Sequence, residues 1–108
     1  MIELIKDVSG LVPQELERAS RNWPLFASDH EGMSILLEEI EETEDELKQV
    51  KKLYSKLWGF VKEDGQLLTL PDEIKAAALQ LAAEAIQVAA MAEKLKKSRA
   101  EREGGEVL

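Results

Sequence analysis

Residues 28–65 read SDHEGMSILLEEIEETEDELKQVKKLYSKLWGFVKEDG. Ser28 and Glu31 form the S-x-x-E pattern of a capping box, which predicts that a helix starts here. Behind this start, side chains able to form one apolar seam recur at alternating spacings of four and three, as on one face of a long helix. They are Leu36, Ile40, Thr43, Leu47, Val50, Tyr54, Leu57 and Val61.

The far end of this helix has two interpretations. The helix can run unbroken to Asp64, with Gly65 as a left-handed stop. Alternatively, Gly59 can interrupt it, because glycine weakens a helix interior. We expect a bend or a break between Lys51 and Gly59.

Residues 69–97 predict a second long helix. Thr69 and Asp72 make a capping pair, and Pro71 suits the first helical turn. A heptad seam follows, made of Ile74, Ala78, Leu81, Ala85, Val88, Ala92 and Leu95. After Lys97 the chain is charged and then glycine-rich, so we expect the helix to fray and residues 99–108 to form a flexible tail.

Two shorter helical segments come before the long ones. Ile2, Ile5 and Val8 mark one short apolar face. Pro13 suits the first turn of a second segment, which we expect to run through Trp23 and to stop at Pro24. No strand pattern occurs, so the sequence predicts one all-α domain over residues 1–98, a helical bundle framed by two long antiparallel helices.

Charge and composition limit the function classes. The 108 residues include 22 acidic and 14 basic side chains, a net charge of −8, which disfavours binding to a nucleic-acid backbone. No cysteine is present, so disulfides and thiolate zinc sites are excluded. No uninterrupted apolar run reaches the ~20 residues that span a bilayer. We therefore expect a cytoplasmic protein that binds neither nucleic acid nor membrane.

The two seams hold more apolar surface than a chain of this size can cover internally. We expect a second copy to complete the bundle, as a homodimer or a dimer of dimers packed across a two-fold axis. Seven seam residues are the expected core: Leu36, Ile40, Leu47, Val50, Leu81, Ala85 and Val88. Three acidic residues, Glu38, Asp45 and Glu46, are expected to be exposed.

One polar stripe interrupts the apolar second helix. Gln80, Glu84 and Gln87 share a face in a stretch made otherwise of alanine, leucine, isoleucine and valine. If this helix is buried between neighbours, Glu84 needs a partner, because an unpaired buried carboxylate is costly. The alternative is that the stripe is the solvent face of a surface helix.

The first long helix offers that partner. Glu39 and Glu42 are three residues apart, so their carboxylates converge on one patch. Such a pair is favoured when a cation lies between the two charges, although a solvated acidic face without a ligand gives the same pattern. Together with Glu84 and Gln87, the pair predicts an oxygen-rich pocket between two antiparallel helices, the donor type that Mg²⁺ prefers.

The residues that carry this chemistry also carry a resemblance. Residues 38–42 read E-E-x-x-E, and residues 84–87 read E-A-I-Q where an E-x-x-D would follow. With these motifs, residues 15–97 resemble the all-α nucleoside triphosphate pyrophosphohydrolases, the MazG-like superfamily, most closely its small phage-associated and uncharacterised members. The resemblance implies Mg²⁺-dependent conversion of a nucleoside triphosphate to the monophosphate and pyrophosphate, with Glu39, Glu42 and Glu84 as catalytic metal ligands.

Several departures from the family pattern change what the resemblance implies. Gln87 stands where the family has an aspartate, so it offers a carbonyl oxygen without charge and is a weak metal ligand. The separation of Glu42 from Glu84 is longer than usual, and the family's helix after the E-x-x-D segment is missing. The resemblance therefore implies reduced or lost activity. No motif marks the cations that would bind the triphosphate; the candidates are Arg18, Arg21, Lys48 and Lys52.

Three further side chains are candidates for the site. Trp23 and Trp58 could stack on a base, but both fall at apolar helical positions, which favours core packing. His30, near the start of a capped helix, suits a surface or capping role. The competing hypothesis for the whole chain is a helical homo-oligomeric interaction module without a small-molecule site, and the position of Glu84 separates the two.

Overall fold

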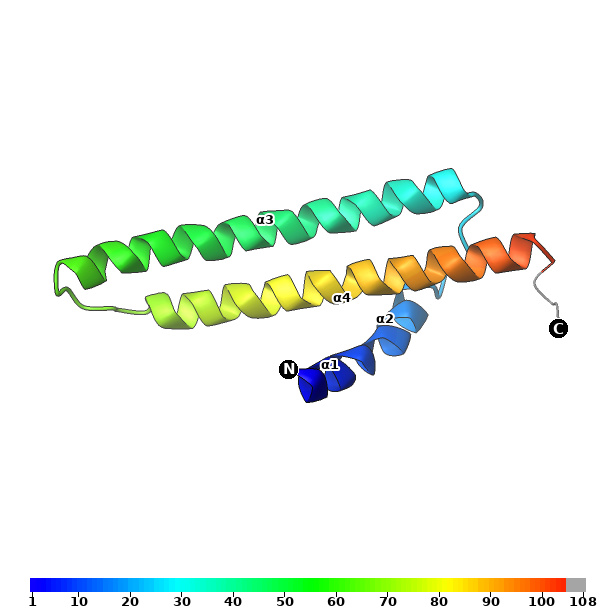
Figure 1. Cartoon of the computed structure of the whole chain (residues 1–108). Coiled ribbons are helices and arrows are strands. Elements are labelled where there is room, and N and C mark those ends of the chain that lie inside the picture. Colours follow the sequence, from blue (N-terminus) through cyan, green and yellow to red (C-terminus); the bar gives the residue numbers. More distant parts are fainter. Residues whose placement is uncertain (105–108) are drawn as a thin grey trace.

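The computed structural model describes residues 1–104 and is all-α over that range, with four helices and no strand. The helices are α1 (Ile2–Ser9), α2 (Leu11–Ala19), α3 (Asp29–Lys62) and α4 (Leu70–Arg102). The two long helices lie side by side in antiparallel order, and α2 packs on α4 while α1 extends away as an arm (Figure 1). The sequence-based prediction of fold class is confirmed.

Helix α3 begins at the expected cap. The backbone N–H of Glu31 donates to Ser28 Oγ over 3.1 Å, and the Glu31 carboxylate accepts from the N–H of Ala27 over 2.8 Å. The helix then continues unbroken to Lys62, so the expected bend between Lys51 and Gly59 is wrong. One glycine costs a helix only about 1 kcal/mol, and the half-buried side chains of Leu57 and Phe60 on either side of Gly59 favour the packed helix.

The left-handed residue after α3 is Asp64, with φ 52°, and not Gly65. Aspartate tolerates this region because its short polar side chain can bond locally. The N–H of Gly65 donates to the carbonyl of Phe60 over 2.8 Å and closes the helix end.

Helix α4 starts with Pro71 in its first turn, as expected. Thr69 pairs with Glu73 rather than with Asp72, since its hydroxyl donates to Glu73 Oε2 over 2.9 Å. The helix does not fray after Lys97 but continues to Arg102. Of the expected flexible tail, residues 105–108 lie outside the described part of the chain.

The N-terminal segments differ more from expectation. Helix α2 ends at Ala19, before Pro24 can act, and Trp23 lies in the following linker with 76% of its surface exposed. Trp58 on α3 is 49% exposed, with Lys62 Nζ 5.9 Å from its ring centroid. Neither tryptophan therefore packs in the core of the single chain, contrary to the expectation. Trp23 is exposed because it lies in the linker beyond the end of α2, where it cannot join the apolar face of that helix.

The buried core lies toward the end of the hairpin at which α3 begins. Leu16, Phe26, Ala90 and Met91 form it, with half-buried Ile35 and others packed around them. None of the seven expected core residues is buried in the single chain. Four are half-buried, namely Leu36, Val50, Leu81 and Val88, and three are exposed, namely Ile40, Leu47 and Ala85.

For the residues of α3, the reason is a rotation of this helix by about 50°, half of one residue step. Its more covered face runs through Gly32, Glu39, Glu46 and Leu53, so the residue after each of these positions faces outward. Glu38 and Asp45 are exposed as expected, whereas Glu46 is half-buried. Only half of the predicted seam therefore lies at the contact with α4.

Within the described residues, α4 is the one helix that is long and apolar enough to cross a membrane by length and composition. Its most apolar 18-residue window has a mean hydropathy of 1.3, and 11% of that window is buried in the single chain. Core helices of water-soluble proteins meet the same criteria. The low burial shows that α4 has much apolar surface left uncovered.

Candidate metal centre

Three carboxylates meet where α3 passes α4. One oxygen from each of Glu39, Glu42 and Glu84 can be chosen so that all three atoms lie within 4.8 Å of one another. The spacing of three residues places Glu39 and Glu42 on one patch of α3, and the antiparallel contact brings Glu84 of α4 to that patch. Glu39 and Glu84 are half-buried, and Glu42 is exposed.

The electrostatics of this cluster are those of crowded like charges. Burial raises the pKa of Glu39, and the neighbouring carboxylates Glu42, Glu84 and Glu38 raise it further. The pKa of Glu42 is also raised, first by a hydrogen bond shared with Glu84 and then by burial and the charge of Glu84. A proton or a cation between these oxygens relieves the repulsion, because either one neutralises charge where solvent is partly excluded.

Gln87 does not extend the carboxylate cluster as a free ligand. Its amide Nε2 donates to the Glu15 carboxylate on α2, and the same carboxylate pairs with Arg18. The Glu15 side chain is only 14% exposed, so this carboxylate depends on both partners. The Gln87 amide therefore links α4 to α2, and an aspartate in its place would repel Glu15.

Glu15 is the polar residue of this region that sequence reasoning missed. Its spacing of three from Arg18 was visible as a possible helical ion pair. Nothing in the sequence, however, indicated that α2 would cross α4 beside Gln87. Arg18, one of the candidate phosphate-binding cations, is therefore already paired with a carboxylate.

The remaining candidate cations lie on the surface. Arg21 is in the linker after α2, and Lys48 and Lys52 are on α3, where all three are exposed. Among residues 1–104, none of the three takes part in an ion pair. Lys48 lies six residues beyond Glu42, about 9 Å along the helix axis.

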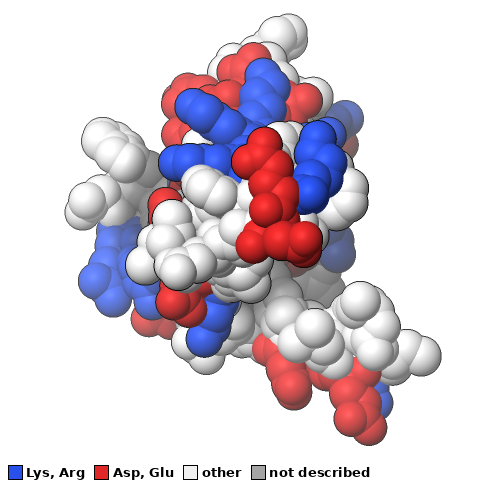
Figure 2. Space-filling model, turned by 90° about the vertical axis from the view of Figure 1, so that its left-hand side faces the viewer, with Lys and Arg blue, Asp and Glu red and all other residues white. Residues whose placement is uncertain are grey.

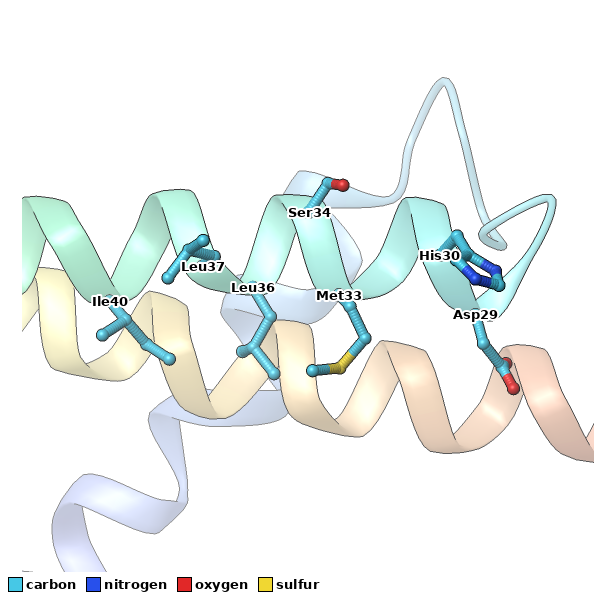
Figure 3. A pocket seen from close by; sticks show the side chains of 7 residues that line it. All are labelled: Asp29, His30, Met33, Ser34, Leu36, Leu37 and Ile40. Atoms are coloured by element: carbon cyan, nitrogen blue, oxygen red, sulfur yellow. The ribbon is translucent and has the colours of Figure 1, made fainter.

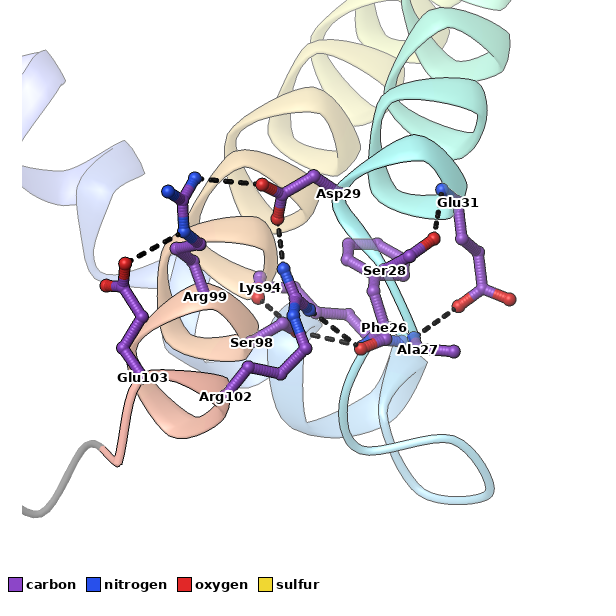
Figure 4. Close-up of polar contacts among 10 residues, drawn as sticks. All are labelled: Phe26, Ala27, Ser28, Asp29, Glu31, Lys94, Ser98, Arg99, Arg102 and Glu103. Carbon is purple, nitrogen blue, oxygen red and sulfur yellow. Dashed lines mark hydrogen bonds and ion pairs between the residues drawn. The ribbon is translucent and has the colours of Figure 1, made fainter.

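A polar network fixes the linker before α3 to the end of α4 (Figure 4). The N–H of Phe26 donates to Ser98 Oγ over 2.8 Å, and this hydroxyl donates to the carbonyl of Lys94 over 2.7 Å. Arg99 and Arg102 both pair with Asp29 in the first turn of α3. These contacts explain why α4 stays helical beyond Lys97, and they hold the two long helices in register at this end.

His30 is exposed at the second residue of α3, on the rim of a shallow apolar groove (Figure 3). Met33, Leu36, Leu37 and Ile40 line the same groove. No carboxylate of the candidate metal centre belongs to it, so the groove and the carboxylate cluster are separate features.

Comparison with known proteins finds no matching family model, no similar curated protein and no similar solved structure. Conclusions about function therefore depend on the geometry described above.

Proposed function

We propose that this chain is a divalent-cation-dependent nucleotide pyrophosphohydrolase of the MazG-like type, with weak activity. The observation that carries the proposal is the convergence of Glu39, Glu42 and Glu84 within 4.8 Å between two antiparallel helices. Two of these carboxylates are half-buried. A bound cation would offset the free-energy cost of removing their charges from water.

The donor set fits Mg²⁺ or Mn²⁺. Magnesium takes oxygen ligands in octahedral order and usually keeps several waters beside one or two carboxylates and the substrate phosphates. Three carboxylates leave positions free for phosphate oxygens. When bound, the cation would stabilise negative charge on a phosphoryl group and lower the pKa of an attacking water.

The chain's own residues would divide the remaining work. Glu39 and Glu84 are half-buried and would hold the cation from two different helices. Glu42 is exposed and would complete the set of three carboxylate ligands from the solvent side of the cluster. Because Gln87 is engaged with Glu15 and brings no charge, cation binding is weaker than a fourth carboxylate would give.

The test is a titration of Mg²⁺ and Mn²⁺ combined with assays on the four ribonucleoside triphosphates and their deoxy forms. Glu84→Gln should weaken cation binding more than about tenfold, since even partners that only orient a ligand contribute 10–100-fold. It should also abolish hydrolysis. Asp45→Asn is the matched control, because it removes one charge from an exposed position on α3. Equal binding by the wild-type protein and Glu84→Gln would refute the proposal.

A second variant pair tests the role of Gln87. Gln87→Asp alone places two carboxylates together, because Glu15 is the partner of the amide. Combining Gln87→Asp with Glu15→Gln returns a hydrogen-bond donor to that contact. We expect the double variant to bind Mg²⁺ more tightly than the wild-type protein and to raise any hydrolysis. No gain in either quantity would mean that position 87 does not limit the site.

The competing proposal is a homo-oligomeric helical module without a small-molecule site. It is favoured by the uncovered apolar surface of α3 and α4, which a binding partner would cover. The two proposals differ over cation binding, since a purely structural module would bind Mg²⁺ no better than any acidic surface.

A further inference from the structure

One flank of α3 carries an apolar side chain at five successive heptad positions. All five side chains are exposed, by 39% to 62% of their surface, although each follows directly after a position that faces α4. They are Met33, Ile40, Leu47, Tyr54 and Val61. Leu37 and Trp58, also exposed, widen this stripe by one position around the helix.

The stripe continues onto α4. Ala78, Ala85 and Ala92 are exposed at the same heptad spacing. Ala92 lines a shallow groove together with Met33 of α3, so the two rows lie on one side of the hairpin. Figure 3 shows Met33 and Leu36 reaching from α3 over α4 on this side. We call this surface, made of the α3 stripe and the α4 alanines, the two-helix face.

The total surface shows how much is left uncovered. The chain exposes 8049 Å². A folded monomer of 12.1 kDa exposes about 6,000 Å², so the excess is about 2,000 Å². The radius of gyration is 18.4 Å, against about 13 Å for a compact domain of this length. Part of this excess belongs to the exposed arm α1. Obligate homodimers bury about 2,000–5,000 Å² in total, a range that the remainder from two chains can reach.

The charges of α3 indicate what covers this face. Residues 38–46 contain seven acidic side chains and no basic one, whereas residues 48–62 contain five lysines and no acidic residue. Seen from the end where α3 leads into α4, several basic side chains lie over the upper part of the molecule, where α3 lies, with acidic side chains beside them (Figure 2). Two copies of α3 in antiparallel order place the acidic half of each against the basic half of the other, which gives complementary charge. A parallel arrangement would oppose like charges.

We infer that the two-helix face binds a second copy of this chain, with α3 against α3 in antiparallel order about a two-fold axis near Leu47. Leu47 is the middle member of the stripe, so Met33 of one copy then lies opposite Val61 of the other. The interface is isologous, as closed dimers require. It joins two hairpins face to face into a four-helix bundle, the arrangement that buries heptad stripes.

This arrangement leaves the candidate metal centre open. Glu39 lies on the side of α3 that faces α4, and Glu42 lies on the flank away from the stripe. Ile40 and Leu47, which belong to the stripe, lie on the opposite flank. The inference therefore does not depend on the proposed function. Lipid is the other chemistry that an apolar face can bind. The charged residues that border the stripe on α3, such as Glu44 and Lys51, make a membrane interior unfavourable.

The first test is sedimentation at tens of micromolar. We expect the wild-type chain to be a dimer or a larger even assembly, and Leu47→Glu to halve its stoichiometry, with a dissociation constant raised at least a hundredfold. Two carboxylates would then meet near the axis without partners. Leu47 is 42% exposed in the single chain, so the variant keeps its helix content by circular dichroism. Trp23→Glu is the control, because it changes a more exposed apolar residue outside the face.

The second test uses the absence of cysteine from the chain. With a short bis-maleimide, Leu47→Cys should form a covalent dimer, whereas Met33→Cys alone should not. Met33→Cys mixed with Val61→Cys after subunit exchange should crosslink. Self-crosslinking of Met33→Cys would overturn the antiparallel order. A monomeric wild-type chain, or a Leu47→Glu variant with unchanged stoichiometry, would overturn the inference; binding of that monomer to anionic phospholipid vesicles would assign the face to lipid.

Discussion

Gly32 is the position where the packing of α3 against its neighbours allows the sharpest stability prediction. A Cβ on Gly32 would lie 2.7 Å from Leu95 Cδ1 and 2.9 Å from Phe26 Cδ2. Leu95 is half-buried and can shift, but Phe26 is 6% exposed and its backbone is held by Ser98 and Arg102. The ring must therefore move as a unit with the linker.

Gly32→Ala combines two opposing effects. Overpacking of this kind costs about 1–3 kcal/mol, and replacing glycine by alanine in a helix returns at most about 1 kcal/mol. We expect a net loss of about 1–2 kcal/mol in the free energy of unfolding. Gly59→Ala is the matched control on the same helix, since nothing lies within 4 Å of its Cβ position. It should stabilise by about 0.5–1 kcal/mol.

Urea unfolding of both variants at one protein concentration measures the difference, because an oligomer's stability depends on concentration. The two variants should differ by about 1.5–3 kcal/mol, with opposite signs relative to the wild-type protein. If Gly32→Ala stabilises as much as Gly59→Ala, the close contact between α3, Phe26 and Leu95 is wrong.

Three further predictions concern buried polar groups and the core. Ser98→Ala should cost about 1–3 kcal/mol, because it leaves the buried N–H of Phe26 without its acceptor; a loss below about 0.5 kcal/mol in urea unfolding would contradict this. Burial lowers the pKa of Lys94, so the folded state disfavours its charged form, and stability rises as pH increases through the lowered pKa. Lys94→Met should therefore be more stable than the wild-type protein at neutral pH, and unfolding across alkaline pH should show that advantage shrink; a constant difference would contradict the sign. Met91→Ala should cost about 2–5 kcal/mol, since Met91 is 5% exposed in the core, and a thermal midpoint within about 2 °C of the wild-type value would show that this core is misplaced.

The sequence predicted the elements of this fold better than their orientation. Capping at Ser28 and the proline start of α4 depend on local chemistry, and both appear in the structure, as do the two long helices that the heptad spacings predicted. The rotation of α3 depends on packing with α4, which no local pattern records. Leu36 and Ile40 looked like members of one broad seam. In the structure Leu36 is half-buried and faces α4 more closely, whereas Ile40 is exposed and faces outward.

The carboxylate cluster was predictable from local spacing, whereas the contacts of Gln87 depend on a distant segment and were not. Glu39 and Glu42 share a patch through helical spacing alone, and one antiparallel contact is enough to add Glu84. The partner of Gln87 is Glu15, 72 residues away on a short helix whose direction the sequence did not reveal. Likewise, the burial of Ser98 and the persistence of α4 beyond Lys97 come from contacts with the distant linker residue Phe26.

The proposed function requires that Glu39, Glu42 and Glu84 bind a divalent cation together. The most direct measurement is a calorimetric titration of Mn²⁺ into the wild-type protein and into Glu84→Gln, with Asp45→Asn as the charge control. We expect one saturable site per chain in the wild-type protein and in Asp45→Asn, and loss of that site in Glu84→Gln. Indistinguishable weak binding in all three proteins would contradict it and leave the cluster as part of an acidic surface.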